Sequence, residues 1–143
     1  MDDLIAFLRA RLDEDEAVAR AAGAESWSAM TEETPDGENI YYTVETRKPP
    51  RAVVESLATG PSAEARIDHM GRHDPARVLA EVDAKRRIAK LYEDHERLDR
   101  ETFEVEGQHA RSLSSLRAAY WDACRHLALP YADHPDYRQE WTP

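Results

Sequence analysis

The histidines His69 and His73 are the first residues of this sequence whose spacing could support chemistry. They stand four positions apart, and on a helix this spacing places two imidazoles on one face, where they could bind zinc. Gly71 lies between them and is expected to end the helix, which would separate the rings. The stretch HMGRH also lacks the glutamate that serves as base in metalloprotease helices. We therefore expect no metal and no cofactor, and keep His69 and His73 only as weak metal candidates.

A nucleophilic pair is the second chemistry to consider. Cys124 precedes His126 by two positions, but residues two apart on a helix point to different faces and would not meet. Carboxylates are too numerous, at 29 in 143 residues, for any one pair to be informative. The glycines form neither a GxGxxG nor a Walker A motif that would hold nucleotide phosphates. The sequence thus predicts no catalytic residues, and a non-enzymatic role is favoured.

The C-terminal stretch LALPYADHPDYRQEW is rich in residues typical of binding surfaces. Pro130 is expected to end a helix, and the chain then turns at Asp133-His134-Pro135, where Asp133 could cap a short terminal turn. In one interpretation the aromatic rings pack over the N-terminal helix as a clasp. In the other they form an exposed docking patch, since Tyr, Trp and Arg are enriched at binding hot spots. The candidate docking residues are Tyr131, His134, Tyr137, Arg138 and Trp141.

The composition narrows the class of protein. The formal charge is −10 and the mean hydropathy is −0.76. No apolar run reaches the roughly 20 residues that span a bilayer, the first residues are acidic, and the single cysteine agrees with a reducing compartment. We therefore expect a cytoplasmic protein without membrane contact. Because phosphate binding depends on Lys and Arg, direct nucleic-acid binding is not expected, and a protein partner with a basic surface fits better.

Residues 1–23 form the first expected element, an amphipathic helix that Gly23 would end. Residues 25–58 mix β-branched and aromatic residues with turn formers, which predicts a small antiparallel hairpin turning at Pro35-Asp36-Gly37. Pro49-Pro50 cannot donate hydrogen bonds to a sheet, so this segment is expected at a connection or an edge. The apolar positions of the helix are Leu4, Ile5, Leu8, Leu12 and Ala19.

Residues 62–130 are expected to be helical, and residues 131–143 form the tail. A short helix begins with Ser62 as its N-cap and ends at Gly71, and Asp74-Pro75 starts the next one. Further on, residues suited to a packing seam recur at alternating steps of four and three on both sides of Gly107, which predicts a long antiparallel helical hairpin with His95 near Tyr120 and Leu98 near Leu116. The first seam contains Ala84, Ile88, Leu91, His95, Leu98, Thr102 and Val105, and the second contains His109, Leu113, Leu116, Tyr120, Ala123 and Leu127.

Charge is unevenly distributed along the first arm of this hairpin. Residues 75–92 are mainly basic and residues 93–106 mainly acidic. Such a charge dipole suits antiparallel self-association, so a homodimer is one expectation, and ordinary solvated helix faces are the other. The heptad pattern is compatible with seams buried within one chain or between two chains.

Three long stretches resemble an uncharacterised family, a domain of unknown function, of small acidic proteins from actinobacteria and their phages. They are DDLIAFLRARLDEDEAVARAA, RHDPARVLAEVDAKRRI and LALPYADHPDYRQEW. The resemblance implies no known activity. Many members of that family carry a cysteine-rich insertion with a CxxC before the tail, which suggests a metal site. This chain has the heptad hairpin and only Cys124 in that interval, so the metal binding that those relatives imply cannot be transferred to it.

The sequence thus predicts a single domain over residues 1–143, with an α+β, mostly helical fold. An N-terminal helix and a small antiparallel hairpin precede a long antiparallel helical hairpin with an aromatic tail. The favoured function is a non-enzymatic protein-interaction or regulatory module. One alternative is an acidic protein that imitates DNA and inhibits a DNA-binding protein. The other is a small metal-dependent protein using His69, His73, His95, His109 or His134.

Overall fold

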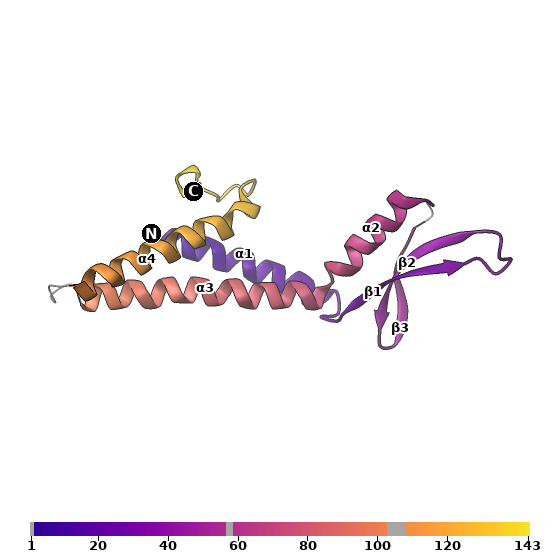
Figure 1. Ribbon diagram of the computed structural model, residues 1–143, viewed down its shortest axis with the longest axis horizontal. Coiled ribbons are helices and arrows are strands. Elements are labelled where there is room, and N and C mark those ends of the chain that lie inside the picture. The colour runs from indigo at the N-terminus through magenta and orange to yellow at the C-terminus, as the bar shows by residue number, and fades with distance from the viewer. Residues whose placement is uncertain (1, 57–58, 103–107) are drawn as a thin grey trace. The chain divides into compact units, whose positions relative to one another are not determined.

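The structure, a computed structural model, describes residues 2–56, 59–102 and 108–143. Over these residues the fold is α+β and mostly helical, as predicted, with a three-stranded antiparallel sheet and four α-helices (Figure 1). The chain divides into two compact units, one of Met1–Glu14 with Val82–Pro143 and the other of Asp15–Glu81. The elements are α1 (Asp2–Ala21), β1 (Trp27–Glu33), β2 (Ile40–Arg47), β3 (Pro50–Ser56), α2 (Pro61–Arg72), α3 (Pro75–Glu101), α4 (Gln108–Ala128) and two 3₁₀ turns, η1 (Leu129–Tyr131) and η2 (Gln139–Trp141).

Helix α1 has the apolar stripe that its sequence predicts. Leu4, Leu8 and Leu12 are completely buried, and Ile5 and Ala19 nearly so. The helix ends where Gly23 adopts a φ of 110°, which glycine reaches without steric cost. The N–H of Gly23 then donates to Arg20 O at 3.0 Å and that of Ala24 to Ala19 O at 3.0 Å, so the last carbonyls of the helix are satisfied.

The sheet has one strand more than the predicted hairpin. β1 and β2 join at the expected turn, where Gly37 has a φ of 69° and its N–H donates to Thr34 O at 2.8 Å. The hydroxyl of Thr34 donates to the Asp36 carboxylate and lowers the pKa of that group. Pro50 then opens β3, which is an edge strand of the sheet, as the proline pair predicted.

Helix α2 packs on β1 and β2 and differs from its prediction at both ends. It begins after Gly60, which has a φ of 96°, and no side chain caps it, so the predicted Ser62 cap is wrong. Gly71 does not end the helix, which continues to Arg72. A Cβ atom on Gly71 would lie 3.0 Å from Ala29 N of β1. Glycine therefore serves close approach of helix and strand at this position, and the core of this unit is formed by Tyr42, Val44, Ala63 and Ile67.

We expect Gly71→Ala to destabilise this unit by about 1 kcal/mol, because an overpacking cost of about 1–3 kcal/mol outweighs a gain in helix propensity of up to about 1 kcal/mol. The strand backbone that the new methyl group would meet is held by its pairing with Val44 and cannot easily yield. Thermal denaturation followed by circular dichroism measures the change. The exposed neighbour Arg66 provides the control Arg66→Ala, which should leave the melting temperature almost unchanged. A Gly71→Ala protein that is more stable than the wild type would contradict this account.

Helix α3 begins at the predicted Asp74-Pro75 boundary. One oxygen of the Asp74 carboxylate accepts the N–H of Arg77 at 2.7 Å and so caps the helix. The other oxygen accepts the N–H of Trp27, at the start of β1, at 3.1 Å. Asp74 is buried, where an unpaired polar group is costly. Its one carboxylate satisfies two backbone N–H groups from segments far apart in the sequence.

Helices α3 and α4 form the predicted antiparallel hairpin. Tyr92 packs on Trp121, with ring centroids 5.3 Å apart, and Asp99 pairs with Arg117 at 3.1 Å, so residue numbers rise along one helix as they fall along the other. The predicted neighbours His95 and Tyr120 have ring centroids 4.9 Å apart. The imidazole Nδ1 donates to Leu91 O at 2.7 Å, within its own helix. The predicted fold at Gly107, the seam residue Val105 and the side chain of His109 lie outside the described residues.

The predicted seam is not the buried face of α3. Val82, Ala89 and Tyr92 are buried, whereas Leu91 and Leu98 remain 39% and 38% exposed. The buried stripe has its own alternation of three and four, which the sequence conceals because charged residues share it. The members of this stripe are Val82, Lys85, Ala89, Tyr92, Glu96 and Asp99.

No helix in the described ranges combines the length and apolar character needed to cross a membrane.

Candidate functional site

The C-terminal tail folds onto α1, and Phe7 is the centre of that contact. Its ring lies edge-on or tilted against four tail rings, which is the favourable geometry for aromatic pairs. Phe7, Tyr137 and Trp141 are all buried. The predicted clasp over the N-terminal helix is therefore observed. Ring centroids lie 6.5 Å from Phe7 for Tyr131, 5.6 Å for His134, 5.9 Å for Tyr137 and 5.1 Å for Trp141.

Backbone bonds and one arginine hold the tail in this shape. Pro130 lies in the 3₁₀ turn that follows α4, close to the predicted end of the helix. In the turn after it, His134 O accepts the N–H of Tyr137 at 2.9 Å and His134 Nδ1 accepts that of Asp136 at 3.1 Å. His134 therefore organises the turn that was expected to depend on Asp133. Arg125 of α4 donates to Trp141 O at 3.2 Å and to the carbonyl of Thr142, which fixes the end of the chain.

Arg11 is a buried cation inside this cluster. Its guanidinium carbon lies 5.2 Å from the centroid of Phe7, and its Nη1 lies 2.6 Å from Nε2 of His134. Nη2 donates to Glu14 at 2.7 Å. Nε is buried and has no hydrogen-bond partner among the described residues. Because a guanidinium has only donors, it needs acceptors around it; Glu14 supplies one, and the Nε donor is unmatched among the described residues.

A cleft of about 450 Å³ opens between α1 and the tail. Its wall contains the buried rings of Phe7, Tyr137 and Trp141 together with Arg11 and Arg138. The guanidinium of Arg138 lies over Trp141, 5.5 Å from the ring centroid, and its side chain is 53% exposed. It pairs with Asp3 at 2.8 Å and more distantly with Glu140 at 3.7 Å.

Of the predicted docking residues, the cleft brings Tyr137, Arg138 and Trp141 together in its wall. Tyr131 and His134 belong to the same ring cluster but contact Phe7 from outside the cleft lining. The buried rings serve packing within the chain, and Arg138 is the member with an exposed polar group. Sequence reasoning missed Phe7 and Arg11. Their spacing could have revealed them, because positions 4, 7, 8 and 11 share one face of a helix.

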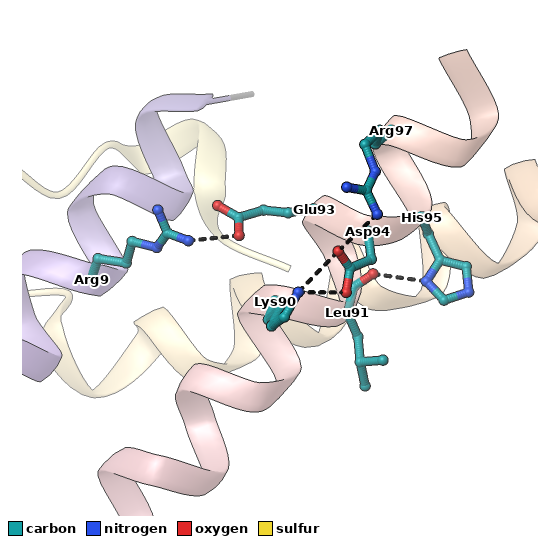
Figure 2. Close-up of polar contacts among 7 residues, drawn as sticks. All are labelled: Arg9, Lys90, Leu91, Glu93, Asp94, His95 and Arg97. Atoms are coloured by element: carbon teal, nitrogen blue, oxygen red, sulfur yellow. Dashed lines mark hydrogen bonds and ion pairs between the residues drawn. The ribbon is translucent and has the colours of Figure 1, made fainter. Parts of the chain in front are cut away.

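A second cleft, of about 490 Å³, lies between α1 and α3 and is dominated by ion pairs. Figure 2 shows Arg9 reaching Glu93, at 2.6 Å, and Lys90 reaching Asp94, at 2.8 Å. Arg86 pairs with Asp13 at 2.5 Å in the same wall. The hydrogen bond from Lys90 is the main reason that the pKa of Asp94 is lowered, with Arg97 adding a smaller effect. The pairs Arg9–Glu93 and Arg86–Asp13 join the two helices, whereas Lys90–Asp94 lies within α3.

The histidines are distributed over both units. The rings of His69 and His73 lie 4.2 Å apart, because α2 continues through Gly71 and keeps them on one face, contrary to the expected separation. His73 Nδ1 donates to His69 O at 2.9 Å. His95 contacts Tyr120 and His134 contacts Phe7. Among the side chains that the structure describes, no three His, Cys, Asp or Glu residues gather in a group that could hold a metal ion.

Cys124 is fully buried on α4, and we expect it to resist alkylation. Burial, with a contribution from the charge of Glu93, raises the pKa of its thiol from 9.0 to about 11. This shift alone lowers the thiolate fraction by about a hundredfold at neutral pH. Iodoacetamide labelling followed by mass spectrometry should be slow in the native protein and fast in denaturant. Labelling of the folded protein at the rate of a free cysteine would contradict this.

The same shift predicts how stability depends on pH. The folded state favours the neutral thiol, so its contribution to the free energy of unfolding is full below pH 9.0. It is lost as the pH rises toward about 11. Cys124→Ser lacks this thiol and is the control, because any loss of stability that it still shows at alkaline pH arises from other groups.

The fold and the cleft define a small α+β protein with a clasped tail and an aromatic and cationic groove. The chain belongs to a family of unknown function, DUF6221, whose model matches residues 1–143. The resemblance to an uncharacterised family is confirmed to that extent, and the actinobacterial and phage origin stays a prediction. Comparisons with curated proteins and with solved structures yield no match.

Proposed function

We propose that this protein is a non-enzymatic protein-interaction module and that the tail cleft is its docking site. The observation that carries this proposal is the position of Arg138. Its guanidinium is half exposed, yet it is oriented by the Trp141 ring beneath it and by Asp3 beside it. A preorganised arginine on a buried aromatic support has the composition of a binding hot spot and loses little entropy on binding.

The chemistry of Arg138 indicates what a partner would present. Both of its ion pairs use Nη1. No other described residue bonds to its Nη2 or Nε, so a second edge of the guanidinium remains available. A carboxylate of the partner could accept two parallel hydrogen bonds at that edge, the strong bidentate geometry of arginine. An apolar side chain beside that carboxylate would face the aromatic wall of the cleft.

Partner capture with Arg138→Ala tests the proposal. Because Arg138 is exposed, its removal should leave the fold intact and abolish retention of a specific protein from a cell lysate. Arg72→Ala is a matched control, since Arg72 is an exposed arginine of the other unit that also faces a carboxylate, Asp68 at 3.8 Å. Equal loss with both variants would show a nonspecific charge effect, and unchanged capture by Arg138→Ala would rule out the cleft.

The alternative of DNA imitation has weaker support from the arrangement of charges. DNA imitation needs an array of carboxylates available to a basic cleft. In the acidic run of α1, Asp13 pairs with Arg86, Glu14 with Arg11 and Glu16 with Arg20. The same capture experiment separates the two functions, because a DNA-binding protein retained equally by wild type and Arg138→Ala, and released by salt, would favour DNA imitation.

A further inference from the structure

The outer seam of α3, defined here as Ala84, Ile88, Leu91, His95, Leu98 and Thr102, is a mainly apolar stripe that the chain leaves only partly buried. Glu93 points toward Arg9 of α1, whereas Leu91 and His95 point away from it (Figure 2). Leu91 and Leu98 are 39% and 38% exposed, and Leu116 of the neighbouring α4 is 43% exposed. The ring of Tyr120 covers His95 in part, with ring centroids 4.9 Å apart, but the described part of the chain leaves the three leucines of this face exposed.

Charge along the edge of the outer seam indicates its occupant. One edge carries Arg87, Asp94 and Glu101 at intervals of seven residues. Arg87 lies at one end of this edge and Glu101 at the other, and Asp94, which pairs with Lys90 of its own helix at 2.8 Å, lies at the centre. Glu101 is exposed and has no ion-pair partner among the described residues, and Arg87 has only Asp83, one turn earlier in its own helix, at 2.7 Å. A second helix with the same sequence, laid antiparallel, would place an arginine beside each unpaired glutamate.

We propose that a second copy of this chain packs on the outer seam of α3 in antiparallel orientation. In this register Ile88 faces Leu98 of the second copy, Leu91 faces His95, and Ala84 faces Thr102. Antiparallel helices bring equivalent edges together, so Arg87 of one copy meets Glu101 of the other on both sides of the two-fold axis. A parallel pair would instead align like charges along the seam.

The size of the seam sets the strength of the dimer. Ala84 to Thr102 span about 27 Å of helix, which is a contact at the low end of stable interfaces. The dimer is therefore weak and forms as the protein concentration rises. Sedimentation velocity from low micromolar to near-millimolar protein should show a mass moving from 16.3 kDa toward twice that value.

A charge swap tests both the surface and the orientation. Arg87→Glu and Glu101→Lys should each weaken the dimer by about tenfold, because each change replaces two symmetry-related attractions with repulsions. The double variant Arg87→Glu, Glu101→Lys should restore it. In a parallel dimer these residues do not face each other, so a double variant no better than the single ones would overturn the antiparallel register.

A second variant tests the apolar part of the contact. Leu91→Lys puts a charge into the centre of the outer seam at an exposed position, so the fold should be retained and the dimer lost. The control Lys48→Ala removes an exposed charge in the other unit and should leave the dimer unchanged. A monomer at every concentration, or a dimer that Leu91→Lys does not affect, would overturn the proposal. Neither result bears on the tail cleft, whose test is independent.

Discussion

Phe7→Ala is expected to lower the free energy of unfolding of its unit by about 3–5 kcal/mol, the usual cost of removing a buried phenylalanine. The loss of stability is concentrated at the contact between α1 and the tail, because four rings of the tail contact Phe7 and few other groups could fill the space that it leaves. The tail should then separate from α1. Hydrogen exchange measured by mass spectrometry should show lost protection in residues 131–141.

Phe7→Leu is the matched control for this prediction. It retains most of the apolar volume and should cost much less than Phe7→Ala, at about 1 kcal/mol. If both substitutions destabilised the protein equally, the ring contacts themselves would be the main contribution. If neither did so, the tail would not be held by Phe7, and the cleft beside it would not be preformed.

Asp74→Ala should cost the other unit about 3 kcal/mol. The estimate combines about 1 kcal/mol for the lost helix cap with about 1–3 kcal/mol for leaving a buried N–H without an acceptor. The two affected donors are the N–H groups of Arg77 and Trp27. Exchange protection should fall both at the start of α3 and at the start of β1, whereas loss of a simple cap would affect the helix alone.

Asp74→Asn separates these two contributions. The amide oxygen can still accept one backbone hydrogen bond, so Asp74→Asn should show about half of the loss in the free energy of unfolding that Asp74→Ala shows. Asp68→Ala removes an exposed carboxylate from α2 and should change stability by less than about 0.5 kcal/mol. An Asp74→Ala protein within that same range would contradict both the helix cap and the bond to the sheet.

The sequence predicted those features that depend on local chemistry. Gly23 ends α1, Gly37 forms the hairpin turn and Asp74 starts α3, because positive φ and unsatisfied N–H groups restrict the residue at each position. The apolar stripe of α1 was also readable. Gly71 was misread, since glycine permits both a helix end and a close approach to another backbone, and only the neighbouring strand distinguishes them.

Features that depend on tertiary contacts were less accessible. α3 has two stripes with heptad spacing, and the more apolar one is the less buried. Charged members such as Glu96 make the buried stripe look like surface in the sequence. Arg11 has the same difficulty, since a buried arginine is recognisable only through the ring and acceptors around it. The clasp itself was predicted from aromatic composition, and its centre at Phe7 was not.

The ion pair between Asp3 and Arg138 has a practical consequence, because it brings the start of α1 and the aromatic tail to the same cleft. A purification tag fused ahead of Asp3 or behind Thr142 would start beside the candidate docking site and could cover it. The turn at Pro35-Asp36-Gly37 is exposed and belongs to the other unit. An epitope inserted there lies outside the residues that line the cleft, and it gives the bait with which partner capture is best attempted.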